Sequence, residues 1–537
     1  MFHFKKFLST VLCILVICGM IGSISACGGG GLNEDGGAIN SYFNEETGEI
    51  TIPEDEKVSI TFWGWGSANA EAVFRQLCSD FMVRHSNITV DYKCYNSSIY
   101  QTTLTQSAAQ LPNLFFLQDY DFLYWVNQGV LWDFTDYVKQ EQLDQVWEMG
   151  YRRYFYDSEQ HVADKTENAR LYGLPKDLGP FALCYNEDLV KQAIASEGSL
   201  TYDEFQGKYH LGDKVPLNWE EFIEMGLLLK SGLAKLSSER YVMGSCEQYP
   251  VYFSNNADYV NENGSAQTVS ADKDGGKFEY ALQWFQDLNF KYGLMPASEA
   301  STNTGGYSLY KSEKAAFFFI GPWDCVSIWG TTTGEPWGFN QMLEPFPYGP
   351  GEDQIYGTKD DGVSTTQIGS AGYFISNQTS TSEAQRAASL MLAEYLCWDE
   401  EAQHTLMMLG DVIPNIKSMA EEYVGLKTVK DLNGNDVEVE PGNLEIFIDI
   451  IDGYDELTED GYDIAEDGLD RVTGKIRTHA RTYKSDWFDE WASTITLSGF
   501  WTKNAQTGQP QCTAAELIER WVPIFDQYLN EYNSYFS

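Results

Sequence analysis

Residues 58–66 read VSITFWGWG, and residues 111–119 read LPNLFFLQD. The first six residues of the first stretch alternate between the two faces of a strand, and the glycines around Trp65 then end that strand. The second stretch contains four consecutive apolar residues, 114–117, which is typical of a strand buried on both faces. Strands of this second kind occur mainly in α/β proteins, whose helices cover both faces of the sheet.

The segment between these two stretches favours the same fold class. Residues 71–84 carry apolar side chains at helical spacing, residues 87–92 suit a strand, and residues 102–110 suit a polar helix. This alternation of strands and helices predicts an α/β lobe with a mostly parallel sheet.

The alternation resumes further along the chain. Apolar runs predict buried strands at 181–185, 315–320 and 371–375, and residues 383–398 have the spacing of an amphipathic helix. Residues 427–440 contain an Asn-Gly pair between two short extended runs, which predicts a β-hairpin. The chain therefore contains enough α/β pattern for more than one sheet.

The first 57 residues are typical of export and attachment rather than of a fold. Residues 1–26 combine a basic start with an apolar run that is shorter than the roughly 20 residues of a membrane-spanning helix. The run ends at Ile-Ser-Ala-Cys27, which resembles a bacterial lipobox and predicts lipidation of Cys27. An ordinary signal peptide with an incidental cysteine is the alternative. Residues 27–57 are rich in Gly, Asn and Glu, and predict a lipidated flexible tether.

Size and charge restrict what the remaining body can do. The chain has 537 residues, which is too long for one hydrophobic core even without the signal, so we expect two lobes or more. A net charge of -44 argues against nucleic acid and anionic lipid surfaces as partners. Aromatic residues make up 15% of the chain, which indicates a folded protein. We expect a soluble monomer that the membrane holds only through its lipid.

The sequence contains no recognisable catalytic or metal-binding motif. Beyond Cys27, seven cysteines remain and none has CxxC spacing, and the six histidines stand singly. No GxSxG, P-loop or HExxH pattern is present. We therefore expect a protein without cofactor, metal or enzymatic activity. Carboxylates are abundant, so counting alone leaves a glycosidase pair open.

The order of the motifs resembles the extracellular solute-binding proteins of carbohydrate ABC importers, the family of maltodextrin-binding protein. The matching segments are 60–65, 111–119, 171–188, 314–324, 372–376, 401–403 and 413–415. The resemblance covers nearly all of 58–537 and implies an α/β, two-lobe periplasmic-binding-protein-like fold (type II), with the ligand between lobes joined by a hinge. It implies that lobe A comprises 58–180 and 369–425, and that lobe B comprises 181–368 and 426–537.

The resemblance and the predicted strand ends together select nine candidate ligand-binding residues. In open α/β sheets ligands bind beyond the carboxyl ends of the strands. A flat aromatic ring covers the apolar face of a sugar, and carboxylates accept its hydroxyl groups. The candidates are Trp63, Trp65, Asp119, Asp177, Tyr185, Trp323, Asp324, Tyr373 and Trp487. Each has a structural alternative: a ring can pack in the core, Asp119 can cap a helix, and Asp177 can form a hinge salt bridge.

These expectations combine into one functional hypothesis. A lipid-anchored protein on the extracellular face of the cell membrane captures a sugar or oligosaccharide and delivers it to the permease subunits of an ABC transporter. The alternatives are a membrane-anchored glycoside hydrolase or lyase, and a solute sensor on the same scaffold. The residues do not select a particular sugar, they leave a non-sugar solute open, and they assign no role to 500–511, which looks like an insertion relative to the family.

Overall fold

The structure is a computed structural model. It describes residues 37–296, 303–331, 335–358, 360–410, 412–431, 433–440, 442–460, 472–476, 481–482 and 487–535. The predicted signal, 1–26, and the predicted lipidation site, Cys27, lie outside these residues. Within them, every helix is too short or too polar to cross a membrane.

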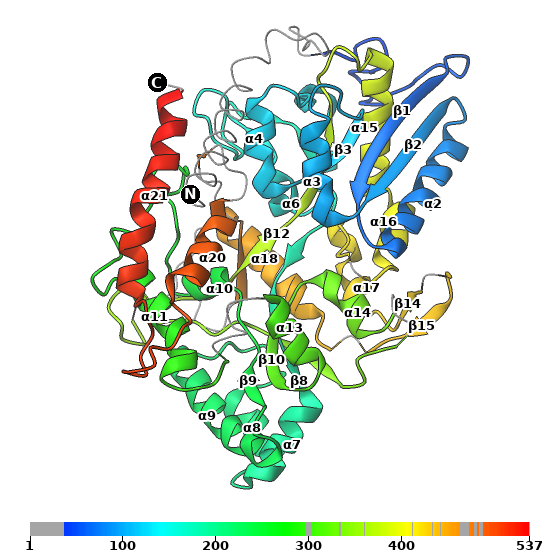
Figure 1. Cartoon of the computed structure of the whole chain (residues 1–537). Coiled ribbons are helices and arrows are strands. Elements are labelled where there is room, and N and C mark those ends of the chain that lie inside the picture. The colour runs from blue at the N-terminus through cyan, green and yellow to red at the C-terminus, as the bar shows by residue number, and fades with distance from the viewer. Residues whose placement is uncertain are drawn as a thin grey trace, which may run out of the picture.

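Five strands form the sheet of lobe A, at the top of Figure 1. In spatial order they are β2 (Ile88–Tyr95), β1 (Val58–Trp65), β3 (Leu114–Gln118), β13 (Ala371–Ile375) and β6 (Gly173–Pro175). The strands β2, β1 and β3 are parallel, as predicted, whereas β13 runs antiparallel to both β3 and β6. The prediction of a mostly parallel sheet holds only for the first three strands, because β13 enters lobe A from the other lobe.

Helices cover the sheet of lobe A on both faces. They are α2 (Ala68–Arg84), α3 (Ser97–Gln106), η1 (Asp119–Asp121), α4 (Phe122–Asn127), η2 (Thr135–Tyr137), α5 (Gln140–Leu143), α6 (Glu148–Arg152), α15 (Glu383–Trp398) and α16 (Glu400–Met407), with a small ladder of β4 (Phe155–Tyr156) and β5 (Arg170–Leu171). The core is rich in aromatic rings: Phe116 lies 5.3 Å from Phe62 and 5.4 Å from Phe74 between ring centroids. Such edge-to-face pairs stabilise the lobe beyond the area that they bury.

Lobe B is built around a second sheet, lower in Figure 1. Its strands, in spatial order, are β11 (Gln341–Glu344), β8 (Ala182–Asn186), β10 (Ala315–Ile320) and β9 (Tyr241–Met243). Its helices are α7 (Glu187–Glu197), α8 (Tyr202–Tyr209), α9 (Trp219–Leu236), α10 (Gln248–Phe253), α11 (Lys277–Phe290), α13 (Asn303–Lys311), η3 (Pro322–Asp324) and α14 (Cys325–Ile328). The apolar strand β10 is fully buried, which confirms the buried strand expected at 315–320.

A third, smaller sheet lies between the two lobes. It consists of β16 (Val472–Ile476), β12 (Ser364–Gly369) and β7 (Gly179–Pro180), in that order. Strand β7 leads into β8 of lobe B, and β12 leads back into β13 of lobe A. We call this the hinge sheet, because the chain crosses between the lobes along two of its strands.

The rest of the chain completes lobe B. It contains η4 (Lys417–Met419), α17 (Ala420–Val424), β14 (Thr428–Lys430), β15 (Asp436–Glu438), α18 (Glu445–Asp460), α20 (Trp487–Ser498) and α21 (Ala514–Tyr535). Ile413, Ile416 and Tyr423, from the part of the chain that is predicted to lie in lobe A, pack in the same hydrophobic cluster as the core of lobe B. In the unassigned segment 500–511, Phe500 and Trp501 join the same core.

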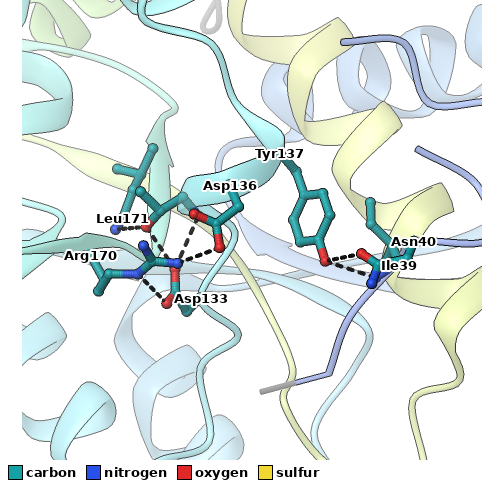
Figure 2. Close-up of polar contacts among 8 residues, drawn as sticks. Ile39, Asn40, Asp133, Asp136, Tyr137, Arg170 and Leu171 are labelled. Carbon is teal, nitrogen blue, oxygen red and sulfur yellow. Dashed lines mark hydrogen bonds and ion pairs between the residues drawn. The ribbon is translucent and has the colours of Figure 1, made fainter. Parts of the chain in front are cut away.

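The predicted tether is partly folded. Residues 37–57, which we call the N-terminal strap, lie on lobe A, and Ile39 is fully buried there. Figure 2 shows the hydroxyl of Tyr137 between two strap residues: it accepts from the Ile39 amide (3.2 Å) and donates to Asn40 Oδ1 (3.0 Å). Nearby, Arg170 pairs with Asp133 and Asp136 at 2.7 Å each. The prediction of flexibility is therefore wrong for this part of 27–57.

Candidate functional site

Aromatic rings gather where β1 and β2 end in lobe A. Trp65 pairs with Tyr95 across the two strands, so β1 continues two residues beyond its predicted end. The ring of Trp65 lies 4.9 Å from that of Tyr100, and the ring of Trp63 lies 5.1 Å from that of Tyr95. Both tryptophans are half-buried. The neighbouring tyrosine rings therefore hold both indoles in place, and part of each indole remains accessible to a ligand.

A continuous line of contacts leads from Trp65 to the chain crossing between the lobes. Trp65 meets Phe116 edge-on at 5.3 Å, and the Lys176 ammonium lies 5.3 Å from the same phenyl ring. Lys176 in turn forms an ion pair with Asp177. Asp177 accepts a hydrogen bond from the backbone of Ala371 at 2.9 Å, which ties β6 to the return crossing.

Trp323 lies at the lobe B end of this line. It follows β10 in η3 and is 44% exposed, the only exposed tryptophan among the described residues. Its indole packs edge-on against Phe181 at 5.2 Å and against the backbone of β7. A methyl group on Gly179 would lie 2.5 Å from Cζ3 of this indole. A glycine in the hinge sheet therefore lets the tryptophan lie flat against the crossing.

Asp324, next to this tryptophan, is poised to titrate near neutral pH. Burial raises the pKa of its carboxyl group to about 7, because a low-dielectric environment disfavours the charge. A hydrogen bond from the Gly321 amide to Oδ2 (3.1 Å) acts in the opposite direction and fixes the side chain. A carboxyl group that changes charge near neutral pH therefore lies next to the exposed indole.

Asp119 serves the hinge in this structure. It begins η1 at the end of β3 and forms a buried ion pair with Arg153 at 2.7 Å. The same guanidinium group donates to the carbonyl oxygen of Ile368 in β12 at 2.9 Å. For Asp177 the sequence left a hinge salt bridge as the alternative to ligand binding. The hydrogen bond that Asp177 accepts from the Ala371 amide is consistent with that alternative. The two aspartates thus hold the crossing strands against lobe A.

Three further candidates lie inside the two cores. Tyr185 in β8 and Tyr373 in β13 have no exposed surface, and burial raises the pKa of both phenols well above the usual value. Trp487 is nearly buried at the start of α20 and stacks on Phe525 at 4.9 Å. The structure therefore brings together Trp65, Asp177, Trp323 and Asp324 along the crossing, and places these three rings elsewhere.

Sequence reasoning missed several residues of this region. Tyr95 escaped because β2 extends three residues beyond the predicted strand 87–92. Lys176 lies inside the matching segment 171–188 but was not selected as a candidate, and its contacts with Phe116 and Asp177 show its place. Asn69 is buried in the first turn of α2, and its amide atoms have no hydrogen-bond partner among the described residues. Its position three residues after Gly66, just before the predicted helix, was the available signal.

The described residues give no sign of a metal centre. They contain no group of three or more His, Cys, Asp or Glu side chains arranged to hold an ion. The seven cysteines beyond Cys27 are all free thiols, and six of them, all but Cys94, are buried. Asp431, in the predicted hairpin, accepts from the Asn433 and Asn435 amides and so closes the turn.

Comparison with solved structures supports the two-lobe architecture. An ABC substrate-binding protein from Listeria monocytogenes, in complex with cycloalternan, matches with a TM-score of 0.60 at 14% identity, covering 88% of this chain and 100% of that chain. A cyclic α-maltosyl-1,6-maltose binding protein from Arthrobacter globiformis matches with a TM-score of 0.57 at 14% identity, covering 88% and 100%. Maltose-bound MalE3 of T. maritima matches with a TM-score of 0.54 at 15% identity, covering 88% and 99%.

At these identities the structural likeness establishes the fold. No curated protein sequence matches the chain significantly. A family model, described as "Bacterial extracellular solute-binding protein", matches residues 76–434, which is more than half of the chain. The match covers both crossings between the lobes and the segment that carries Trp323. The chain therefore belongs to the bacterial extracellular solute-binding proteins.

Proposed function

We propose that this protein captures a sugar, in particular an oligosaccharide, between its lobes and delivers it to the permease of an ABC transporter. The observation that carries the proposal is Trp323, an exposed indole fixed against the chain crossing with a carboxyl group beside it. An indole that its neighbours hold in place and that remains exposed offers a preformed flat apolar surface to a ligand. Sugars present the matching surface, because their C–H faces are apolar while their edges carry hydroxyl groups.

The charges around the crossing favour an uncharged ligand. Two cations near the crossing, Lys176 and Arg153, are each paired with an aspartate. The chain as a whole carries a net charge of -44, which repels anionic solutes. Trp65 and Trp63 offer further aromatic surface on the facing lobe. Trp63 and Trp65 from lobe A and Trp323 from lobe B can then contact one sugar ligand from both sides.

The proposed mechanism is a hinge closure. The ligand stacks on the tryptophans, and the ionised carboxylate of Asp324 accepts a hydrogen bond from a sugar hydroxyl group. Closure follows only to the extent that the sugar binds the closed form more tightly than the open one. The signal and Cys27 would place the protein on the extracellular face of the membrane, held by its lipid, where a permease can receive the sugar unchanged. The sugars in the related structures, cycloalternan and maltose, support this ligand class.

Isothermal titration calorimetry against cycloalternan, maltotriose and β-1,6-galactobiose tests the proposal. Trp323→Ala and Trp65→Ala should each weaken the best ligand about ten-fold or more, which corresponds to about 1.4 kcal/mol. Trp329→Ala is the matched control, because this indole is engaged with the Glu440 carbonyl oxygen (3.1 Å) and lies outside the line of contacts. Unchanged affinity in both test variants would refute the site.

A second readout separates a receptor from an enzyme. After prolonged incubation with purified protein, the sugar should be recovered intact by chromatography. Appearance of new reducing ends or of shorter products would favour the glycoside hydrolase instead. Loss of binding in Trp323→Ala without any turnover in the wild type would support the receptor.

A further inference from the structure

The C-terminal helix contacts both lobes. Along α21, Trp521, Phe525 and Leu529 pack in the core of lobe B, whereas Tyr532, one turn later, is buried in the core of lobe A. Figure 1 shows this helix (red) running along one side of the molecule from the level of lobe B to that of lobe A. A helix that is built into one lobe and ends in the other must respond when the lobes move.

The end of α21 is joined to lobe A by a short chain of hydrogen bonds. Asn127, at the end of α4, donates from Nδ2 to the hydroxyl of Tyr532 at 2.6 Å. The hydroxyl of Tyr156 donates to Asn127 Oδ1 at 2.5 Å, which fixes the amide between the two tyrosines. The neighbouring Asn533 donates to the carbonyl oxygen of Ser265 in lobe B at 3.0 Å. The last turns of the helix are therefore tied to both lobes at once.

Arg481 provides a second link at the same place. Its guanidinium group donates to the carbonyl oxygen of Gln160 in lobe A, and also to that of Asn263 in lobe B at 3.1 Å. Its own amide donates to the carbonyl oxygen of Gly264 at 2.8 Å. We call the residues of both links, Asn127, Tyr156, Gln160, Arg481 and Tyr532, the interlobe latch.

The latch and Trp323 lie beyond opposite edges of the hinge sheet. Trp323 packs against β7, which forms one edge. Arg481 follows shortly after β16, which forms the other edge, and β12 lies between them. A rotation about this sheet that brings the lobes together at Trp323 therefore separates them at the latch.

We propose that Tyr532 is a positioning residue that opposes closure and so lowers the sugar affinity of the protein. In the arrangement described here the latch holds lobe A against α21, and a closing rotation about the hinge sheet must break or stretch its hydrogen bonds. Because ligand binding is coupled to closure, the free energy of the latch is subtracted from the free energy of binding. This inference rests on the proposed function for its affinity readout, but the geometry of the lobes can be measured without any sugar.

Two tyrosines of α21 allow a matched test in the full chain. Tyr532→Phe removes the hydroxyl that joins the lobes, while Tyr528→Phe removes one that donates to Glu490 within lobe B at 2.7 Å. Tyr532→Phe should tighten sugar binding by up to about five-fold, the equivalent of one ordinary hydrogen bond. Tyr528→Phe should leave the affinity unchanged. Without sugar, small-angle X-ray scattering should show a smaller radius of gyration for Tyr532→Phe only.

Further outcomes decide between the latch and a purely structural role. Arg481→Gln removes the second link and should shift affinity and radius in the same direction, which keeps the test available if Tyr532→Phe fails to fold. Equal affinity and radius in the two phenylalanine variants, or weaker binding in Tyr532→Phe, would overturn the proposal. If no sugar binds the wild type, the proposed function fails, and the scattering comparison alone then supports or refutes the latch.

Discussion

Sugar binding should weaken as the pH falls, and Asp324 should be the cause. Burial raises the pKa of this carboxyl group to about 7 in the free protein. In the proposed complex only the ionised carboxylate accepts a ligand hydroxyl, so the ionised fraction is the binding-competent fraction. That fraction is about 0.9 at pH 8 and about 0.1 at pH 6 for such a pKa. Since the apparent dissociation constant scales inversely with the competent fraction, it should rise about ten-fold between pH 8 and pH 6.

Calorimetry at constant ionic strength measures this directly. Binding at pH 7 should release about half a proton, because the ligand-bound state keeps Asp324 ionised. Repeating the titration in two buffers of different ionisation enthalpy gives that number. Asp324→Asn keeps the shape of the side chain and can still accept from the Gly321 amide. Its affinity should be nearly independent of pH over this range.

Two results would refute the reasoning. A wild-type affinity that is flat from pH 6 to pH 8 would mean that the ligand does not contact the ionised carboxylate. An equal pH dependence in wild type and Asp324→Asn would assign the proton to another group. Glu344 and Glu394, whose pKa values burial raises to about 8, are the other buried carboxyl groups that titrate nearby.

Three further predictions concern stability and the crossing. Burial raises the folded-state pKa of Glu344 to about 8, so the wild type should lose stability as the pH rises from 4.5 to 8 and this carboxyl group ionises. Glu344→Gln should not lose this stability, and its advantage in free energy of unfolding at pH 8 should be on the order of 3 kcal/mol. Melting temperatures of both proteins across this pH range measure the difference. Gly179→Ala should displace the Trp323 indole and weaken sugar binding about ten-fold by calorimetry, while an unchanged affinity would show that the indole can move without loss. Arg153→Met should lower the free energy of unfolding by about 3–5 kcal/mol in urea, because it leaves Asp119 charged, buried and without this partner. Arg75→Met is the control, since its exposed pair with Glu71 should contribute less than about 1 kcal/mol.

The sequence predicted the strands that are defined by their own composition. The apolar run 315–320 is β10, the run 371–375 is β13, and the amphipathic segment 383–398 is α15, all with the predicted bounds. Trp323 was selected because it follows a Gly-Pro pair at a strand end and matches a position of the resemblance, and the structure places it after β10 with its ring exposed. The local sequence is sufficient to predict an element when its apolar pattern and the turn residues at its ends indicate the same bounds.

Features that depend on distant partners could not be predicted. The pairing of Asp119 with Arg153 joins residues 34 positions apart, and nothing in either local sequence shows it. Residues 37–57 have the composition of a tether, yet Ile39 finds an apolar site on lobe A that only the folded lobe creates. Tyr373 and Tyr185 end in the cores because their strands are central in their sheets, an order that the linear sequence does not encode.

Because the N-terminal strap is bound to lobe A, a lipid at Cys27 would hold lobe A close to the membrane. The strap is fastened to lobe A alone, through Tyr137 and through Arg386, which donates to the Ala38 carbonyl oxygen at 3.3 Å. If the proposed lipid holds the protein at Cys27, residues 27–36 separate the lipid from the strap, and an extended chain of that length spans at most about 35 Å. Lobe A would then stay close to the bilayer, and closure would move lobe B relative to lobe A, against the hydrogen bonds of the interlobe latch. The proposed permease would thus find lobe A at a nearly constant distance from the bilayer, and the orientation of lobe B would differ between the sugar-bound and sugar-free protein.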